Sequence, residues 1–408
     1  MAPEGSVGIS LRHAFGLGTN LLGSIQSVDP DTLVFSSGNC LIRHTVSTNQ
    51  QRIVSVGTRI SAMAISPCHK YLSVAEEQTQ GTGMGVSVWT IGSMRKKVYH
   101  ALNVNAKSIH ALAYSNSAKS LVMYTSGPAF AFLEIDVETG QVLKQTNDVA
   151  DSEHGIRVLS VDLQGDVVIA GDRMLKVLRP ESNGVRVLLP NLHGQPLGSY
   201  TCAAMLPDGR RVIGTASGDV LILRRTEVVS SFTPFRDLPV NVPAVSTFGV
   251  TALLCHGDTL TVAMEGGILC VYKLNLPGAE GQAEDEEAET GARENAGEAG
   301  NPVFVRAITL TAACDRYRDV DSASSFQLSA MESYLLEEED DTEVSFRPKV
   351  TELALSIRVT SLVPRKAGSV FALVNGDALK TVFSVELEPK PVDVVQATLE
   401  EGQKKKGG

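Results

Sequence analysis

The 408-residue sequence lacks the features that mark membrane-spanning, secreted and coiled-coil proteins. No run of about 18 or more apolar residues occurs, which argues against a transmembrane helix. The N-terminal stretch MAPEGSVGISLRHAFGL has no basic-then-apolar layout of the kind that a secretory signal needs. No heptad pattern is present either. The ordinary proportions of apolar residues (43%) and charged residues (20%) are typical of a globular protein.

Cysteine is scarce, and its spacing shows no pairs of the C-x-x-C kind. Most of the cysteines lie among strand-like residues, so we expect buried free thiols in a reducing compartment. The six are Cys40, Cys68, Cys202, Cys255, Cys270 and Cys314.

Acidic charge is concentrated in two segments. Residues 278–300 hold eight acids and one arginine, and residues 332–343 hold seven acids and no base. These segments carry −14 of charge in a chain whose net charge is −10, so the rest of the chain has a net charge of about +4. Three of those positive charges are Lys404–Lys406 in the tail. A nearly neutral folded part lacks the basic face that nucleic-acid binding requires, and we expect neither a nucleic-acid nor a membrane partner.

A short apolar strand followed by a turn recurs seven times along the chain. Its reference copy is ISAMAIS at 60–66. The other copies are LGSIQSV (22–28), IHALAYS (109–115), IRVLSVD (156–162), YTCAAML (200–206), VTALLCH (250–256) and IRVTSLV (357–363). After each copy come a second strand, a turn, a third strand and a more variable fourth strand. Gly, Pro, Asp and Asn mark the turns because they supply unusual backbone angles or side-chain hydrogen bonds.

Seven repeats of four strands predict an all-β, seven-bladed, WD40-like β-propeller. The acidic insertions lack the apolar content for a core, which predicts disorder there. The predicted organisation is an N-terminal segment at 1–21, a candidate ring-closing strand; most of blades one to six at 22–277; an acidic insertion at 278–300; the last strand of blade six at 301–313; a second acidic insertion at 314–349; blade seven at 350–399; and a charged tail at 400–408. The segments 7–15 and 392–399 are alternative candidates for the strand that closes the ring.

The repeats keep part of the WD40 chemistry. GVSVWT retains the tryptophan as Trp89 but places Thr90 where the pattern has aspartate, and no blade has a clear Gly-His start. The best single match is FLEIDVETGQVL at 132–143, where a D-x-x-T-G turn reverses the chain. We interpret six positions as structural blade positions: Trp89, Asp136, Thr139, Gly140, Asp208 and Gly209.

The N-terminal quarter carries a more specific resemblance. The stretches HAFGLGTN (13–20), DTLVFSSGNCLIRHTV (31–46), AISPCHKYLSVAEE (64–77) and VSVWTIGSMRKKV (86–98) resemble the start of the cilia- and flagella-associated protein 57 family. The shared features are Phe15-Gly16-Leu17, Gly38-Asn39, Ser66-Pro67 with Tyr71-Leu72, and Glu76-Glu77.

This resemblance implies a non-enzymatic scaffold on the doublet microtubules of the axoneme. Members of that family help to seat inner dynein arms and neighbouring regulatory complexes, so axonemal proteins are the expected partners, with tubulin contacted indirectly. The family continues into a second propeller and long coiled coils, which this sequence does not show, so the functions of those coiled coils are not carried over.

Candidate catalytic and metal sites are weak. Adjacent Cys68 and His69 have poor geometry for one zinc ion, and the repeat places them in a turn. GTGMG at 81–85 precedes a strand, whereas a phosphate-binding loop needs a following helix. No G-x-S-x-G elbow is present, and we interpret the histidines as core or turn residues. We therefore predict no catalytic, cofactor-binding or metal-binding residue. The eight histidines are His13, His44, His69, His100, His110, His154, His193 and His256.

The acidic segments lack the D-x-D-x-D-G pattern of a calcium loop. The main interpretation is a solvated, self-repelling linker, with contact to a basic partner protein as the alternative. MESYLLEE at 331–338 is either disordered or a short docking helix. The lysine tail is either an ordinary charged terminus or a tubulin contact.

The leading functional hypothesis is therefore an axonemal scaffold. Two alternatives stay open: a cytoplasmic propeller adaptor in a ubiquitin-ligase, trafficking or ribosome-assembly complex, and a propeller enzyme with its site in the central channel.

Overall fold

The computed structural model describes residues 23–77, 84–128, 130–147, 149, 155–182, 184–194, 196–237, 248–274, 302–309, 358–366, 368–375 and 380–387. Within these ranges the chain is almost all β-strand, and its one helical element is the short 3-10 helix η1, Pro234–Asp237. None of the described residues belongs to a helix that is long and apolar enough to cross a membrane.

The strands form seven antiparallel sheets, one for each predicted repeat. Blade 1 contains β1 (Ile25–Asp29), β2 (Thr32–Ser37), β3 (Cys40–Thr45) and β4 (Gln50–Ser55); blade 2 contains β5 (Ile60–Ile65), β6 (Tyr71–Glu76), β7 (Gly85–Thr90) and β8 (Arg95–Ala101); blade 3 contains β9 (Ile109–Tyr114), β10 (Ser120–Thr125), β11 (Phe132–Asp136) and β12 (Val142–Thr146). Blade 4 contains β13 (Ile156–Val161), β14 (Val167–Gly171), β15 (Met174–Glu181) and β16 (Gly184–Leu188); blade 5 contains β17 (Tyr200–Met205), β18 (Arg211–Thr215), β19 (Val220–Arg224) and β20 (Glu227–Phe232). Blade 6 contains β21 (Val250–His256), β22 (Thr259–Met264), β23 (Ile268–Leu274) and β24 (Pro302–Thr309); the described part of blade 7 contains β25 (Arg358–Pro364), β26 (Ser369–Asn375) and β27 (Lys380–Glu386).

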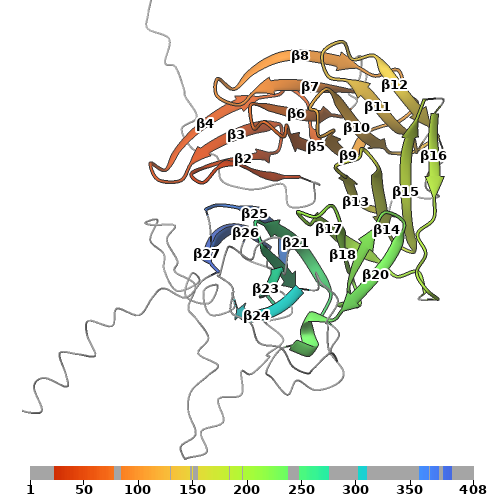
Figure 1. Ribbon diagram of the computed structural model, residues 1–408. Helices are drawn as coiled ribbons and strands as arrows, with labels where there is room; N and C mark the ends of the chain where they lie inside the picture. The colour runs from red at the N-terminus through yellow and green to blue at the C-terminus, as the bar shows by residue number, and fades with distance from the viewer. Residues whose placement is uncertain are drawn as a thin grey trace, which may run out of the picture.

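The seven sheets are arranged around a common centre (Figure 1). In each blade the chain starts at the innermost strand and moves outward one strand at a time, so that β4, β8, β12, β16, β20 and β24 lie at the periphery. The prediction of a seven-bladed β-propeller is confirmed.

Burial explains why the fourth strands vary most in sequence. The second strands β6, β10, β14, β18 and β22 are buried along nearly their whole length, because neighbouring blades cover both faces of the sheet there. Their residues are accordingly apolar on both faces. The outer strands β4, β8, β12 and β16 are mostly exposed or half-buried, and their sequences are mixed.

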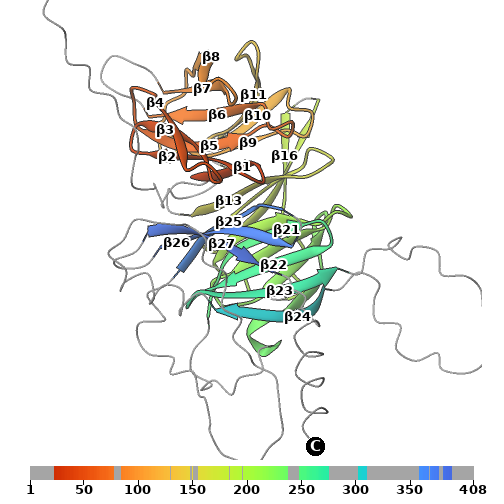
Figure 2. The same cartoon turned by 90° about the vertical axis from the view of Figure 1, so that its left-hand side faces the viewer.

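Blades 1 and 7 are neighbours in space although they lie at opposite ends of the described chain (Figures 1 and 2). One apolar cluster joins them, with Ile25, Leu33, Phe35 and Ile42 from blade 1 and Val363, Phe371 and Leu373 from blade 7. In the described residues, this cluster packs the inner and middle strands of the two blades together. The segments predicted at 1–21, 278–300, 314–349 and 392–399, together with the tail at 400–408, lie outside the described residues.

The turn after the innermost strand repeats in blades 2 to 5 and in blade 7. Its fourth residue has a left-handed backbone, with φ of 56° at His69, 57° at Ala118, 89° at Gly165, 83° at Gly209 and 72° at Gly368. The amide of this residue closes the turn onto the carbonyl of the first turn residue in blades 2 to 5, for example from His69 to Ser66 at 2.8 Å. Blade 6 has a shorter turn of two residues between β21 and β22, and its first residue, Gly257, is left-handed with φ of 61°. Glycine suits this conformation because it has no Cβ, so His69 and Ala118 occupy it at some cost.

Candidate functional site

The D-x-x-T-G segment of blade 3 forms a tightly bonded turn. Oδ1 of Asp136 accepts hydrogen bonds from the amides of Glu138 (3.0 Å) and Thr139 (2.8 Å) and from the Thr139 hydroxyl (2.9 Å). The Thr139 hydrogen bonds hold the pKa of the Asp136 carboxyl below its usual value. The amide of Gly140 completes the turn by donating to the Asp136 carbonyl at 2.9 Å. The Asp136 carboxylate therefore stabilises its own turn.

The other blade positions also have local structural partners. The indole Nε1–H of Trp89 donates to Oγ of Ser87 at 2.8 Å, and the Trp89 side chain is buried. Nζ of Lys96 lies 5.3 Å from the centroid of the same ring, a cation–π contact. Asp208 accepts the Arg210 amide at 3.0 Å and pairs with Nε of Arg210 at 2.6 Å. Gly209 supplies the left-handed turn residue between them.

Cys68 and His69 lie in the turn between β5 and β6. Nδ1 of His69 donates to the carbonyl of Val28 at 2.7 Å, which ties blade 2 to blade 1. Sγ of Cys68 lies 3.3 Å from Oγ of Ser66, and this hydrogen bond lowers the pKa of the exposed thiol. The described residues contain no group of three or more His, Cys, Asp or Glu side chains that could hold a metal ion. In the described structure Cys68 and His69 therefore make hydrogen bonds that hold the turn and join it to blade 1.

The cysteines differ from expectation in their burial. The five described cysteines are free, as predicted, but only Cys270 is buried. Cys40, Cys202 and Cys255 are partly exposed because they lie on innermost or third strands whose faces reach the channel or the surface, and Cys68 is fully exposed in its turn. Cys314 lies outside the described residues.

The remaining candidates are dispersed through the fold. His44, His100, His110 and His256 lie in four different strands of four blades, His193 lies in a turn, and His13 and His154 fall outside the described residues. Nε2 of His100 donates to the carbonyl of Val137 at 2.8 Å. In GTGMG, residues 81–83 lie outside the described part, and Gly85 begins strand β7, so a strand follows this segment as predicted.

The first concave feature is the central channel, a cavity of about 490 Å³ lined by residues of all seven innermost strands. Its threonine hydroxyls donate to backbone carbonyls: Thr201 to Val250 at 2.5 Å, Thr251 to Ala263 at 3.3 Å and Thr360 to Leu373 at 3.4 Å. The first of these bonds joins blades 5 and 6, and the other two lie within blades 6 and 7. They are not the nucleophile-to-base contacts that covalent catalysis uses.

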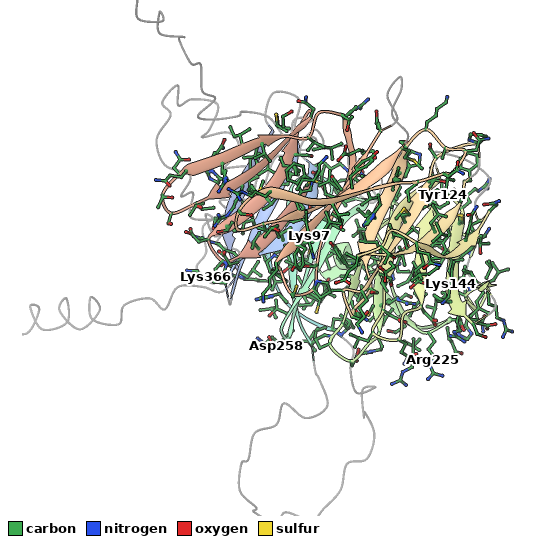
Figure 3. The ribbon with its side chains drawn as sticks, turned by 90° about the horizontal axis from the view of Figure 1, so that it is seen from above. Lys97, Tyr124, Lys144, Arg225, Asp258 and Lys366 are labelled. Atoms are coloured by element: carbon green, nitrogen blue, oxygen red, sulfur yellow. The ribbon has the colours of Figure 1, made fainter. Side chains whose placement is uncertain are left out.

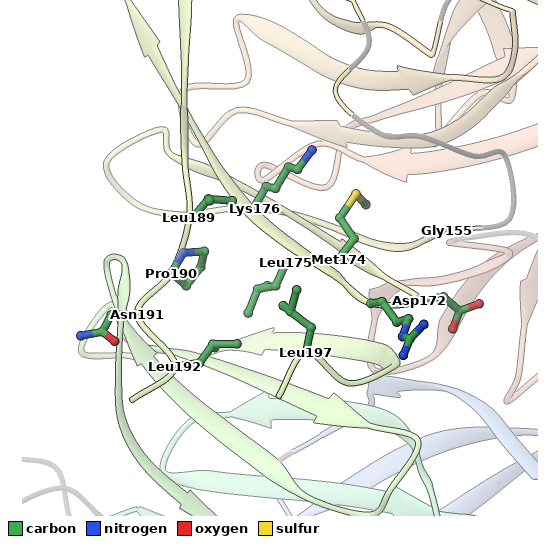
Figure 4. A pocket seen from close by; sticks show the side chains of 11 residues that line it. Gly155, Asp172, Met174, Leu175, Lys176, Leu189, Pro190, Asn191, Leu192 and Leu197 are labelled. Atoms are coloured by element: carbon green, nitrogen blue, oxygen red, sulfur yellow. The ribbon is translucent and has the colours of Figure 1, made fainter. Parts of the chain in front are cut away.

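The second concave feature is a groove of about 480 Å³ on the side of blades 4 and 5, which we call the blade 4–5 groove. One wall is the β14–β15 turn and the start of β15, with Asp172, Arg173, Met174, Leu175 and Lys176. The other wall is the connection from β16 to β17, residues 189–199, which we call the strap. The strap contributes Leu189, Pro190, Asn191, Leu192 and Leu197. In Figure 4 the side chains of Leu175, Leu192 and Leu197 lie in the middle of the groove, with Asn191 at one end and Asp172 at the other.

Backbone hydrogen bonds hold the strap at both ends. The amide of Asn191 donates to the carbonyl of Thr226 at 2.7 Å, and its carbonyl accepts the amide of Val228 at 3.2 Å. At the other end the carbonyl of Gly198 accepts the amide of Arg173 at 3.0 Å, and the Ser199 hydroxyl donates to the Asp172 carboxylate. Both ends of the strap are therefore bonded to blades 4 and 5.

This chain is similar to cilia- and flagella-associated protein 57 of Mus musculus. The two are 23% identical over 219 residues, which covers 52% of this chain and 17% of the mouse protein. The predicted resemblance to cilia- and flagella-associated protein 57 is thereby confirmed, and the match reaches beyond the N-terminal quarter. No family model matches the sequence.

Among solved structures, the one titled "Structure of U3-55K" has a TM-score of 0.55 to this chain at 11% sequence identity. The superposition covers 88% of this chain and 92% of that chain. At this identity the likeness shows the propeller fold alone.

Sequence reasoning missed the blade 4–5 groove. The strap belongs to LLPNLHGQPLGS at 188–199, which has the composition of an ordinary Pro- and Gly-containing loop. The available signal was the presence of three leucines in a connection between strands, since connections are usually polar.

Proposed function

We propose that this protein is a non-enzymatic scaffold of the ciliary or flagellar axoneme, which helps to position inner dynein arm or associated regulatory complexes on doublet microtubules. The observation that carries the proposal is the similarity to cilia- and flagella-associated protein 57 across half of a propeller chain. The mouse protein is much longer than the matched region, so the dynein-positioning role is part of the proposal and not of the comparison.

The physical properties of the fold support a scaffold. A ring of seven sheets keeps its shape because each blade packs against two neighbours. The loops between strands then form broad surfaces at fixed distances from one another, on which several proteins can be held together.

Retention of the protein in isolated axonemes tests the proposal. A tagged full-length chain is expressed in ciliated cells, the membranes are removed with detergent, and the axonemal and soluble pools are compared. A tagged soluble protein of similar mass serves as the control. We expect most of the tagged chain in the axonemal pool, and its release by high salt if polar contacts hold it.

Cross-linking mass spectrometry on the same axonemes identifies the neighbours. Lys97, Lys144 and Lys366 are spread across the molecule (Figure 3), so the pattern of cross-links also reports which side faces which neighbour. Cross-links to dynein or regulatory-complex subunits support the proposal. Recovery in the soluble pool with no axonemal cross-links contradicts it and favours the cytoplasmic adaptor.

A further inference from the structure

Two leucine side chains that line the blade 4–5 groove are largely exposed to solvent. Leu189 of the strap is 74% exposed and Leu197 is 50% exposed, and both line the same groove. Neighbouring exposed leucines on a concave surface mark interaction sites far more often than a single exposed leucine does. The backbone next to these leucines is bonded to the blades, at Asn191 on one side and at Gly198 on the other.

Positive charge surrounds this apolar surface. Arg173 lies at the Asp172 end. At the opposite end, Arg224 is the last residue of β19 and Arg225 follows it in the turn to β20, where the Thr226 carbonyl accepts the amide of Asn191. Among the described residues, no ion pair joins these three arginines to a carboxylate. Arg225 projects from the edge of the molecule in Figure 3.

The acids near the groove already have partners. Oδ2 of Asp172 lies 3.4 Å from Nη2 of Arg157, and Asp172 also accepts the Ser199 hydroxyl. Oε1 of Glu227 lies 3.4 Å from Nε2 of His193. The groove therefore has an apolar middle and a surplus of positive charge at both ends.

We propose that the blade 4–5 groove binds a short acidic peptide segment of a partner protein, with leucine-type side chains in the groove and Asp or Glu residues on either side of them. The leucine-type side chains bury against the exposed Leu189 and Leu197, beside the buried Leu175 that also lines the groove. The flanking carboxylates lie near Arg173 at one end and near Arg224 and Arg225 at the other. Apolar burial supplies most of the affinity, and the charges supply rate of association and selectivity.

Selection from a phage-displayed library of random peptides on the immobilised full chain tests this. We expect enriched peptides that combine leucine-type residues with flanking acids. The double variant Leu189→Ser, Leu197→Ser should lose about tenfold in affinity for the best synthetic peptide, measured by fluorescence anisotropy, because two apolar contacts are removed. Its matched control is Leu163→Ser, since Leu163 is 66% exposed in the β13–β14 turn of the same blade and lies outside the groove.

The charge requirement is tested with Arg173→Glu combined with Arg225→Glu. This variant should bind the same peptide several-fold more weakly, and should lose the salt dependence of the unaltered chain. Arg95→Glu, at an exposed position in blade 2, should bind like the unaltered chain. Unchanged unfolding midpoints in all variants show that the fold is intact.

Three results overturn the proposal. They are enrichment of basic or leucine-free peptides, enrichment that the groove variants do not change, and an affinity that rises strongly in Leu335→Ser, Leu336→Ser. The third would mean that the chemically similar acidic segment of this same chain occupies the groove in place of a partner. The proposal rests on the scaffold function only for its biological context. Peptide selection uses purified protein, whereas axonemal retention is measured in cells. Either experiment can therefore fail without the other.

Discussion

Nη2 of Arg211 in blade 5 lies 2.6 Å from Oδ2 of Asp162 in blade 4, inside the protein. The Arg211 side chain is 2% exposed and that of Asp162 is 9% exposed. The same Nη2 donates to the carbonyl of Asp166 at 2.8 Å, and the Asp166 carboxylate pairs with Arg179 at 2.7 Å. Nδ2 of Asn116, in blade 3, donates to the carbonyl of Asp162 at 2.5 Å. One polar network therefore joins three consecutive blades around the buried Arg211–Asp162 pair.

Arg211→Met should lower the free energy of unfolding by about 3–5 kcal/mol, because it leaves Asp162 buried without its positive partner. Denaturant unfolding followed by circular dichroism measures the change. Arg186→Met is the control, since Arg186 and Glu181 are 3.9 Å apart and largely exposed, and such pairs contribute at most about 1 kcal/mol. Equal effects of the two substitutions would show that the buried network does not stabilise the ring.

Gly140→Ala should destabilise the protein by about 2–4 kcal/mol. Gly140 has φ of +73°, and a Cβ there would lie 2.3 Å from Nδ1 of His100 in the neighbouring blade, so strain and overlap combine. The unfolding free energy of purified Gly140→Ala measures the sum.

Gly38→Ala separates the two effects of the Gly140 substitution. Gly38 has φ of +61° but nothing within 4 Å of its added Cβ, so only strain of about 1 kcal/mol is expected. Introducing Gly140→Ala into a His100→Ala background should then cost about the same as Gly38→Ala. If the cost stays as high as in the native background, overlap with His100 is not its cause.

Tyr114 should make the stability of the ring sensitive to alkaline pH. Its hydroxyl shares a hydrogen bond of 2.6 Å with Ser73 of the neighbouring blade, and burial raises the pKa of Tyr114 from 10.0 to about 12. The unfolded chain therefore loses the phenol proton first, so this contribution to stability is complete below pH 10.0 and is lost as the pH rises to about 12.

Tyr114→Phe should be less stable than the native chain by about 1 kcal/mol at neutral pH, since it removes the hydrogen bond to Ser73. Above the unfolded-state pKa of 10.0 the difference should shrink, because only the native chain carries the ionising phenol. Denaturant unfolding at a series of pH values measures both chains. A difference that is constant across this range would contradict a raised pKa for Tyr114.

The blades could be predicted from the sequence because their period is repeated and their turns have distinctive residues. The dipeptide Asp208-Gly209 predicts a turn by itself, since glycine accepts the left-handed backbone angle that the turn requires. His69 and Ala118 hold the same angle without being glycine, and only their position in the repeat indicates it. Trp89 and the D-x-x-T-G segment likewise indicate where the third strands of blades 2 and 3 lie.

The contacts between blades could not be predicted. Arg210 and Arg211 are adjacent, yet Arg210 pairs with Asp208 two residues away, while Arg211 pairs with Asp162 in another blade. The period of a strand places the two side chains on opposite faces but does not say what each face meets. Leu189 and Leu192 likewise look equivalent in the sequence, and only the path of the strap leaves Leu189 exposed.

The contact between blades 1 and 7 should make the ring one cooperative unit. Phe371 and Phe35 are buried together in the cluster that joins these blades, so Phe371→Ala should lower the free energy of unfolding by about 3–5 kcal/mol.

Trp89, the single tryptophan of the chain, lies in blade 2 and reports on that blade by its fluorescence. In a cooperative ring, the Trp89 transition shifts with the substitution in blade 7 and stays coincident with the transition seen by circular dichroism. Val142→Ala, at a 41% exposed position on β12, should shift neither signal appreciably. A Trp89 transition that stays in place while circular dichroism detects earlier unfolding would show that blade 7 detaches on its own, because the apolar cluster then fails to couple it to the ring.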